Sequence, residues 1–281
     1  MASCRVDLVA ELSGHTGRVW SLDWAPDGGV LASCGGDQTV RLWAQEGGFG
    51  PWVCVDILDG VHRKSVRSVS FAPGSRMLAS AGFDASVGVY ERVGAEWECV
   101  ATLDGHESEV KAVSWSASGQ LLATCGRDRT VWVWELQPEN EFDCVGVMHG
   151  HTQDVKSVRW HPHDDVLLSS SYDDTVKAWR EDGDDWVCAQ TLGGHGCTVW
   201  DLCFEPRPAS GNPRLATCGG DGAVLTWASP AAGEGWERAG EMPGSGTDCP
   251  AYAVDWSAYG CVATAGGDNV VRLYQERGGA G

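Results

Sequence analysis

One pattern recurs through almost the whole chain, an Asp followed six residues later by a Trp or Tyr. It occurs six times, and successive Asp positions lie 47, 44, 45, 48 and 47 residues apart. A period of about 40 to 45 residues is typical of four-stranded sheets repeated around a ring. The sequence therefore predicts an all-β propeller. The six segments are Asp37–Trp43, Asp84–Tyr90, Asp128–Trp134, Asp173–Trp179, Asp221–Trp227 and Asp268–Tyr274.

Each unit consists of short apolar runs separated by turn residues. In the third unit we expect strands at 110–115, 121–124 and 130–134, with an outer strand at 97–103 before them. No amphipathic helical stretch of useful length lies between these runs, which supports an all-β fold. The expected repeats in a single domain are 14–58, 61–103, 105–148, 150–192, 194–240 and 246–281.

Residues 5–12 offer one further strand, which could complete the last unit. Closing the ring in this way removes the exposed sheet edges that invite aggregation. Two architectures stay open, a closed ring of six blades and a seven-blade design that is one unit short. We favour the second, because the six units show no adaptation to a tighter ring. An open ring would leave the first and last blades with apolar faces in water.

Four polar residues recur at matching positions, a His, a Ser or Thr four residues before the Asp, the Asp and the Trp. Buried together, these groups can satisfy one another's hydrogen bonds in a chain. A single His, Ser and Asp set would suggest a hydrolase triad, but repetition around the ring favours a structural role over catalysis. The sets are His15, Ser33, Asp37, Trp43; His106, Thr124, Asp128, Trp134; His151, Ser169, Asp173, Trp179; and His195, Thr217, Asp221, Trp227.

Charge and composition exclude several classes of partner. Lys and Arg number 20 and Asp and Glu 39, giving a formal net charge of −19. This balance argues against broad binding to nucleic acids or anionic membranes. No apolar stretch reaches 18 residues and the N-terminus has no apolar signal region. The expected compartment is the cytoplasm, with the nucleus left open.

The twelve cysteines are expected to be reduced thiols, because no Cys-x-x-Cys pair occurs. Seven stand at repeat positions, so they are distributed around the ring and cannot converge on one ion or cluster. We expect them to be buried small apolar residues. No phosphate-binding loop, dinucleotide fingerprint or His-Glu-x-x-His motif occurs, so no cofactor or metal is expected. The seven are Cys54, Cys99, Cys144 and Cys188, and Cys34, Cys125 and Cys218.

The repeat resembles the WD40 family over residues 5 to 274, and the relatives it resembles most have seven blades. In WD40 proteins, the residues five after the His and one before the Asp lie on one face of the ring. Here they supply four cations, Arg67, Lys111, Arg127 and Lys156, and five aromatics, Trp20, Trp200, Tyr252, Phe83 and Tyr172.

This cation and aromatic arc has two interpretations. A cluster of cations in a protein of negative net charge, with aromatic residues between them, suits a ligand that has carboxylates and an apolar anchor, such as a peptide C-terminus. The alternative is a solvated rim with aromatics packed between blades, and Glu109 and Asp154 dilute the positive charge. We favour binding.

Several strings resemble a narrower family, the WD40 subunit of the cytosolic iron-sulfur protein assembly targeting complex. They include Leu31-Ala-Ser-Cys-Gly-Gly-Asp37, Gly105-His-Glu-Ser-Glu-Val-Lys111 and Ser171-Tyr-Asp-Asp-Thr-Val-Lys177. The resemblance implies a non-catalytic adapter, not an enzyme. Its partners would be two other subunits of that complex and apoprotein clients, some recognised through a C-terminal tripeptide ending in Trp or Phe. Arg127 is the leading candidate contact.

Two departures from this family stand out. No seventh unit is present, which would remove one side of any groove between the last blade and the first. Where the family carries Leu-Tyr-Arg, a co-chaperone contact, this chain has Ala178-Trp179-Arg180.

The alternative function is an unrelated WD40 adapter, such as a ubiquitin-ligase substrate receptor or a histone-peptide reader.

Overall fold

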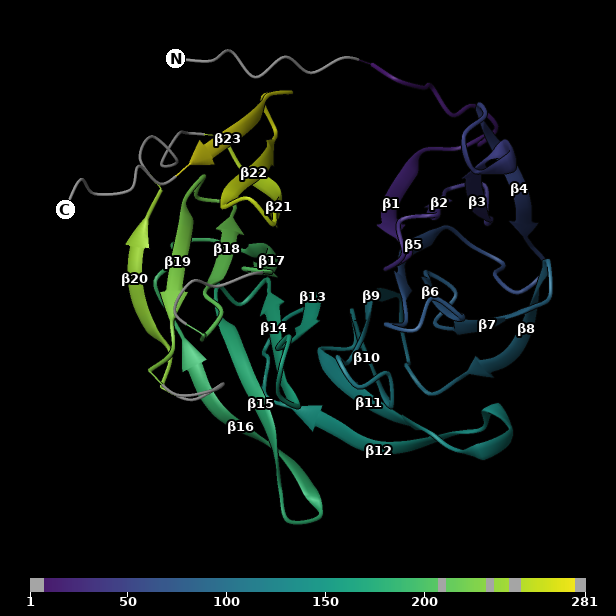
Figure 1. The fold of residues 1–281 in the computed structure, drawn as a ribbon. Coiled ribbons are helices and arrows are strands. Elements are labelled where there is room, and N and C mark those ends of the chain that lie inside the picture. The colour runs from purple at the N-terminus through teal and green to yellow at the C-terminus, as the bar shows by residue number, and fades with distance from the viewer. Residues whose placement is uncertain (1–7, 207–210, 231–234, 243–248, 276–281) are drawn as a thin grey trace.

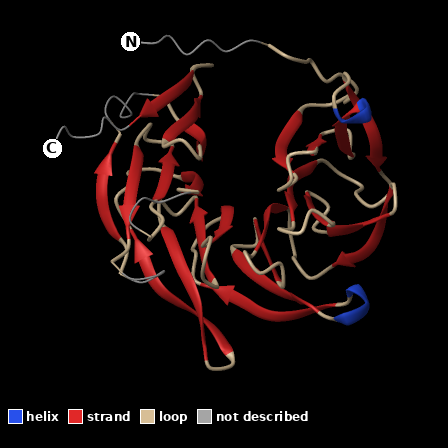
Figure 2. Cartoon of the chain, in the orientation of Figure 1, coloured by secondary structure: helices blue, strands red, loops and turns tan. Residues whose placement is uncertain are grey.

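The fold consists almost entirely of antiparallel strands arranged around a central opening (Figures 1 and 2). The computed structural model describes residues 8–206, 211–230, 235–242 and 249–275. These ranges contain 23 strands and two short 3-10 turns, η1 (Glu46–Gly48) and η2 (Pro138–Asn140), and no α-helix. The predicted all-β propeller is confirmed.

The strands form six sheets, five of four strands and one of three, each a blade. The first blade holds β1 (Val19–Trp24), β2 (Val30–Gly35), β3 (Val40–Gln45) and β4 (Trp52–Leu58), and the second holds β5 (Val66–Phe71), β6 (Met77–Gly82), β7 (Val87–Val93) and β8 (Glu96–Leu103). The third holds β9 (Val110–Trp115), β10 (Leu121–Gly126), β11 (Thr130–Leu136) and β12 (Phe142–His149), and the fourth holds β13 (Val155–Trp160), β14 (Val166–Ser171), β15 (Val176–Asp182) and β16 (Asp185–Leu192). The fifth holds β17 (Val199–Phe204), β18 (Leu215–Gly219), β19 (Val224–Ala228) and β20 (Glu237–Glu241), and the last holds β21 (Ala251–Trp256), β22 (Cys261–Gly266) and β23 (Val271–Gln275).

The apolar core lies between neighbouring blades. Strand residues alternate between the two faces of a sheet, and in the third blade both faces are covered. Val110 and Val113 of β9 pack toward the second blade, and Val131 and Val133 of β11 pack in the cluster shared with the fourth. All four are fully buried. Each blade is therefore held by the blades on either side of it.

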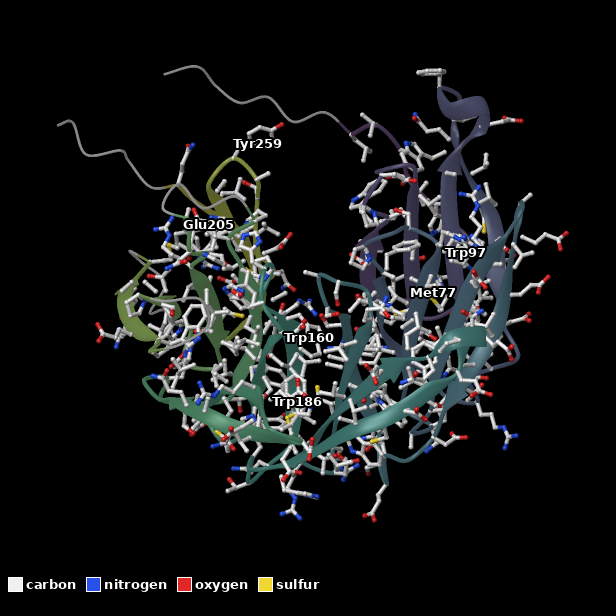
Figure 3. The ribbon with its side chains drawn as sticks, turned by 60° about the horizontal axis from the view of Figure 1, so that its bottom comes forward. Met77, Trp97, Trp160, Trp186, Glu205 and Tyr259 are labelled. Carbon is white, nitrogen blue, oxygen red and sulfur yellow. The ribbon has the colours of Figure 1, made fainter. Side chains whose placement is uncertain are left out.

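Aromatic residues extend this core toward the rim. Trp160 of β13 and Trp186 of β16 meet edge to face, with 5.5 Å between ring centres (Figure 3). Phe71 with Trp97 and Trp115 with Phe142 repeat the arrangement in the second and third blades. The high Trp content of the sequence therefore reflects several aromatic positions that are reused from blade to blade.

The described part of the expected closing strand does not adopt strand structure. Residues 8–12 contain no strand, and residues 5–7 lie outside the described residues. Among the described residues the last blade therefore has three strands, with β23 at its edge, and Figure 1 shows an open side between β21–β23 and β1–β4. Leu8 and Val9 are exposed. The chain entering β1 lies on the first blade's side of the opening, so it does not pair with β23 (Figure 1).

The two blades beside the opening have apolar residues in water. Leu22 of β1 is 61% exposed, whereas Val69 and Leu202, at the matching positions of the second and fifth blades, are 4% and 0% exposed. On the opposite side, Leu273 of β23 is 69% exposed. Tyr259, in the turn between β21 and β22, projects from the outer end of the last blade (Figure 3). The side chains that neighbouring blades cover elsewhere are uncovered here.

Candidate interaction site at the mouth of the ring

The repeated polar sets hold each blade together. In the third blade, Trp134 Nε1 donates to Thr124 Oγ1 at 3.1 Å. The Thr124 hydroxyl lies 2.9 Å from His106 Nε2, and His106 Nδ1 lies 2.7 Å from Asp128 Oδ2. This chain of bonds ties the turn before β9 to strands β10 and β11. The first, fourth and fifth blades repeat it, and in the second blade Tyr90 takes the place of Trp.

The electrostatics of these sets fit a structural role. Burial opposes ionisation of Asp128, but hydrogen bonds from His106 and Thr130 outweigh it and lower the pKa of this carboxyl to about 2. In the fifth blade, burial lowers the pKa of His195 despite the nearby Asp221 carboxylate. The His106 side chain is 1% exposed, and none of the described set residues lines the central cavity. The groups are satisfied internally and are covered from solvent.

The last blade departs from the pattern. Asp268 occupies the repeat position, but its partner is Arg272 of β23, through both carboxylate oxygens. Tyr274 stands where four other blades have the Trp. The turn of this blade is thus fixed by an ion pair instead of a buried imidazole.

A central cavity of about 1350 Å³ runs through the ring and opens toward the gap between β1 and β23. The innermost strands line it in layers, because every second residue of such a strand faces the axis. The upper layer, five residues after each His position, contains Trp20, Arg67, Lys111, Lys156, Trp200 and Tyr252. Six of the nine predicted site residues therefore meet in one cavity.

Three neighbouring strands place cations in this upper layer. The Arg67 guanidinium lies 4.9 Å from the Trp20 ring centre, and Arg67 Nη1 donates to the Trp20 carbonyl oxygen at 3.4 Å. Lys111 Nζ and Lys156 Nζ lie 3.1 and 3.6 Å from the same atom, Asp154 Oδ2. One carboxylate is thus shared between two ammonium groups.

Aromatic rings continue the layer on the other side. Lys156 Nζ lies 3.4 Å from the ring centre of Tyr172 and 5.1 Å from that of Trp200. Tyr172 and Trp200 meet edge to face at 5.2 Å, as do Trp200 and Tyr252. Cation–π contact of this kind stabilises an ammonium without neutralising its charge.

The other three predicted residues lie in the turns beside the cavity. Phe83 faces Lys111, with 5.8 Å between ring centre and ammonium. Tyr172 covers Lys156, as described above. Arg127 is 59% exposed at its side chain and lies 3.1 Å from Glu109 Oε1. Glu109 therefore offsets the positive charge of Arg127, and Asp154 offsets part of the charge of Lys111 and Lys156.

The cavity also has a lower charged layer, which was not predicted from the sequence. Asp23, Arg159 and Asp255 stand eight residues after the His position in their blades and line the cavity below the cations. Asp23 accepts a hydrogen bond from the Phe71 amide at 2.6 Å, and burial raises the pKa of Asp23 to about 6. A β-bulge near the start of each inner strand interrupts the alternation, so counting three residues on from the upper-layer position would have found these three residues.

The cysteine expectation is partly wrong. Cys34, Cys125 and Cys218 are buried as predicted, and burial raises the pKa of each thiol. The four on outer strands, Cys54, Cys99, Cys144 and Cys188, are exposed. Blades radiate from the axis, so neighbouring sheets diverge outward and cover their outer strands less. Within the described ranges, no three His, Cys, Asp or Glu residues converge to hold a metal ion.

Comparison with known proteins agrees with this architecture. The family model described as WD domain, G-beta repeat, matches residues 6–44, 52–91, 97–135, 142–180 and 186–227. A mosquito protein from Culex quinquefasciatus, named probable cytosolic iron-sulfur protein assembly protein Ciao1, is 50% identical over 98% of this chain and 84% of its own length. The chain belongs to the WD40-repeat family of cytosolic iron-sulfur protein assembly proteins.

Other members of this family give the same result. The CIAO1 homologues of Chlamydomonas reinhardtii and Ixodes scapularis are 46% and 45% identical, over 96% and 98% of this chain and 83% and 85% of their own lengths. In the described part of the chain, no helix is long and apolar enough to cross a membrane.

The tripeptide Ala178-Trp179-Arg180, which differs from the family's Leu-Tyr-Arg, has a structural role at its centre. Trp179 is 2% exposed and donates a hydrogen bond to Ser169. It is thus part of the structural set of its blade.

Proposed function

We propose that this protein is a non-catalytic adapter in cytosolic iron-sulfur protein assembly, working in the cytoplasm and binding its partners at the mouth of the ring. The observation that carries the proposal is the upper layer of the cavity, where three cations stand between aromatic rings in a chain of net charge −19. Its relatives carry the name of the same assembly process. The partners we propose are the other subunits of the targeting complex and apoprotein clients.

An adapter role accounts for the polar sets without catalysis. Each set is buried and internally bonded, so no imidazole of these sets is free to act on a substrate. The groups at the mouth are cations and aromatics, and aromatic residues and Arg are enriched among the residues that dominate protein interfaces. Recognition at the mouth therefore needs no reaction.

Charge reversal at the mouth tests the proposal. The double variant Arg127→Glu and Lys111→Glu should lose capture of assembly factors from a cell extract by the tagged full chain, while it still melts in a cooperative transition that shows it is folded. The matched control is Arg92→Glu with Lys177→Glu, which reverses two charges outside the mouth. This control should capture the same proteins as wild type.

Two results would contradict the proposal. Unchanged capture by the mouth variant would show that partners bind elsewhere. Capture of ubiquitin-ligase or histone components in place of assembly factors would favour the unrelated adapter.

A further inference from the structure

The lysine pair at the mouth has too little negative charge around it. Lys111 and Lys156 share the single carboxylate of Asp154, and the Lys156 side chain is only 8% exposed. Burial, and then the neighbouring Lys111 ammonium, lower the pKa of Lys156 to about 8. Two buried like charges with one counter-ion are unfavourable unless a further anion compensates them.

Nearby carboxylates do not supply that anion. Glu109 attracts Lys111, but its ion pair is with Arg127 at 3.1 Å. Asp201, the residue after Trp200 on β17, accepts from the Ser157 hydroxyl at 2.9 Å and from the Val254 amide at 3.3 Å. It lies close enough to Arg67 for electrostatic attraction. Within the described residues, however, no carboxylate lies within 4 Å of the Arg67 guanidinium.

The remaining neighbours of the pair are aromatic or cationic. Tyr172 and Trp200 face Lys156, and Phe83 faces Lys111. Arg159 lines the cavity below on the same strand as Lys156. Within the upper layer alone, Arg67, Lys111 and Lys156 stand against Asp154, which is an excess of two positive charges; Asp201, outside this layer, attracts Arg67 over a longer distance.

An excess of two charges matches a dianion better than a single carboxylate. A phosphoryl group carries between about 1.5 and 2 negative charges at neutral pH and presents three acceptor oxygens. Ammonium and guanidinium donors form their strongest hydrogen bonds with such oxygens. A monocarboxylate would leave one of the two excess charges unmatched.

We infer that Lys111, Lys156 and Arg67 form a binding site for a dianionic phosphoryl group. The group is either inorganic phosphate or pyrophosphate, or a phosphorylated side chain of a protein partner. The inference rests on the mouth being the recognition surface proposed above, and it names the chemistry that the surface recognises.

Calorimetric titration of the full chain with pyrophosphate, at pH 7.5 and constant ionic strength, tests the site. Wild type should bind, and Lys156→Gln should bind about tenfold more weakly, because a charge-assisted contact is lost. Lys177→Gln is the matched control, since Lys177 lies outside the cavity, and it should bind as wild type does. Melting curves without ligand establish that each variant is folded, and Lys111→Gln serves as a second probe should Lys156→Gln be unstable.

The pH dependence separates this site from general attraction to a basic surface. Wild-type affinity should fall as the pH rises from 7.5 to 9.5, because Lys156 loses its proton over that range. Lys156→Arg keeps its charge at pH 9.5 and should retain affinity there. Equal pyrophosphate affinity in wild type and both glutamine variants, or a profile unchanged by Lys156→Arg, would overturn the inference.

Two phosphate sources are distinguished by parallel titrations with a phosphoserine peptide and its unphosphorylated form. Tighter binding of the phosphopeptide than of inorganic phosphate supports a modified partner, and similar binding supports a free ion. Failure of every phosphate probe, while the Arg127 and Lys111 reversal still abolishes partner capture, would overturn this inference and leave the adapter function standing. Phosphate binding without any effect of that reversal on capture would instead contradict the adapter function.

Discussion

Replacing Asp128 by Asn tests how much the repeated polar sets stabilise the ring. All four partners of this carboxylate are donors: Thr130 contributes its amide and hydroxyl, Glu107 its amide and His106 its Nδ1. An Asn amide would direct two N–H groups at some of these donors, so at least one bond is lost. The Asp128 side chain is 8% exposed, which keeps solvent screening small.

The magnitude follows from the pKa of Asp128. Lowering it from 3.8 to about 2 corresponds, after a discount for partial solvation, to about 2 kcal/mol of stabilisation by the ionised form. A loss of that size should lower the melting temperature by about 4 to 8 °C at pH 7. Asp104→Asn is the control, because the Asp104 side chain is exposed and makes no hydrogen bond with the described residues, and this variant should melt as wild type does.

The lowered pKa of Asp128 also predicts how its stabilising effect changes with pH. A carboxyl whose folded pKa is depressed contributes its stabilisation above its unfolded pKa and loses it as the pH falls through the folded value. The difference in melting temperature between wild type and Asp128→Asn should therefore be full above about pH 5 and shrink between pH 4 and 2. A variant that melts with wild type at pH 7, or a difference that does not shrink on acidification, would refute the reasoning.

Two further changes probe packing and the indole bond. Leu202→Ala, at a fully buried position, should cost about 2 to 5 kcal/mol in unfolding free energy. Leu22→Ala changes the same register position beside the opening and should cost less than about 1 kcal/mol, because Leu22 is 61% exposed. Both costs are measured by urea titration. If the two variants lost equal unfolding free energy, the opening would be filled in solution. Trp134→Phe removes the donor to Thr124 and should cost about 1 kcal/mol in the same titration. An unchanged urea midpoint would show that the hydrogen bond between Trp134 and Thr124 does not stabilise the fold.

The repeat predicted most of the fold because every unit carries its own strand and turn signals. The strands at 110–115 and 130–134 were placed to within two residues at each end, since alternating apolar residues and the Asp turn mark them locally. Six cavity-lining side chains followed from one register position. Local pattern was sufficient wherever a residue's environment is set by its own blade.

Other features depended on neighbours that local pattern does not describe. Pairing of residues 8–12 with β23 requires the two ends of the ring to meet, which depends on the angles between all six blades. Exposure of Cys99 depends on how far adjacent sheets diverge at the circumference. The sharing of Asp154 by Lys111 and Lys156 arises from the turn geometry of two blades together.

The open side gives this array of blades two free ends. In a closed ring every blade is clamped by two others, whereas here β1 and β23 each border only one neighbouring blade, so local opening is easiest there. Backbone amides of the first and last blades should exchange with deuterium sooner than those of β9 and β13. Because of the opening, rigidity should increase from the first and last blades toward the middle of the chain, where the most rigid blades carry Lys111 and Lys156.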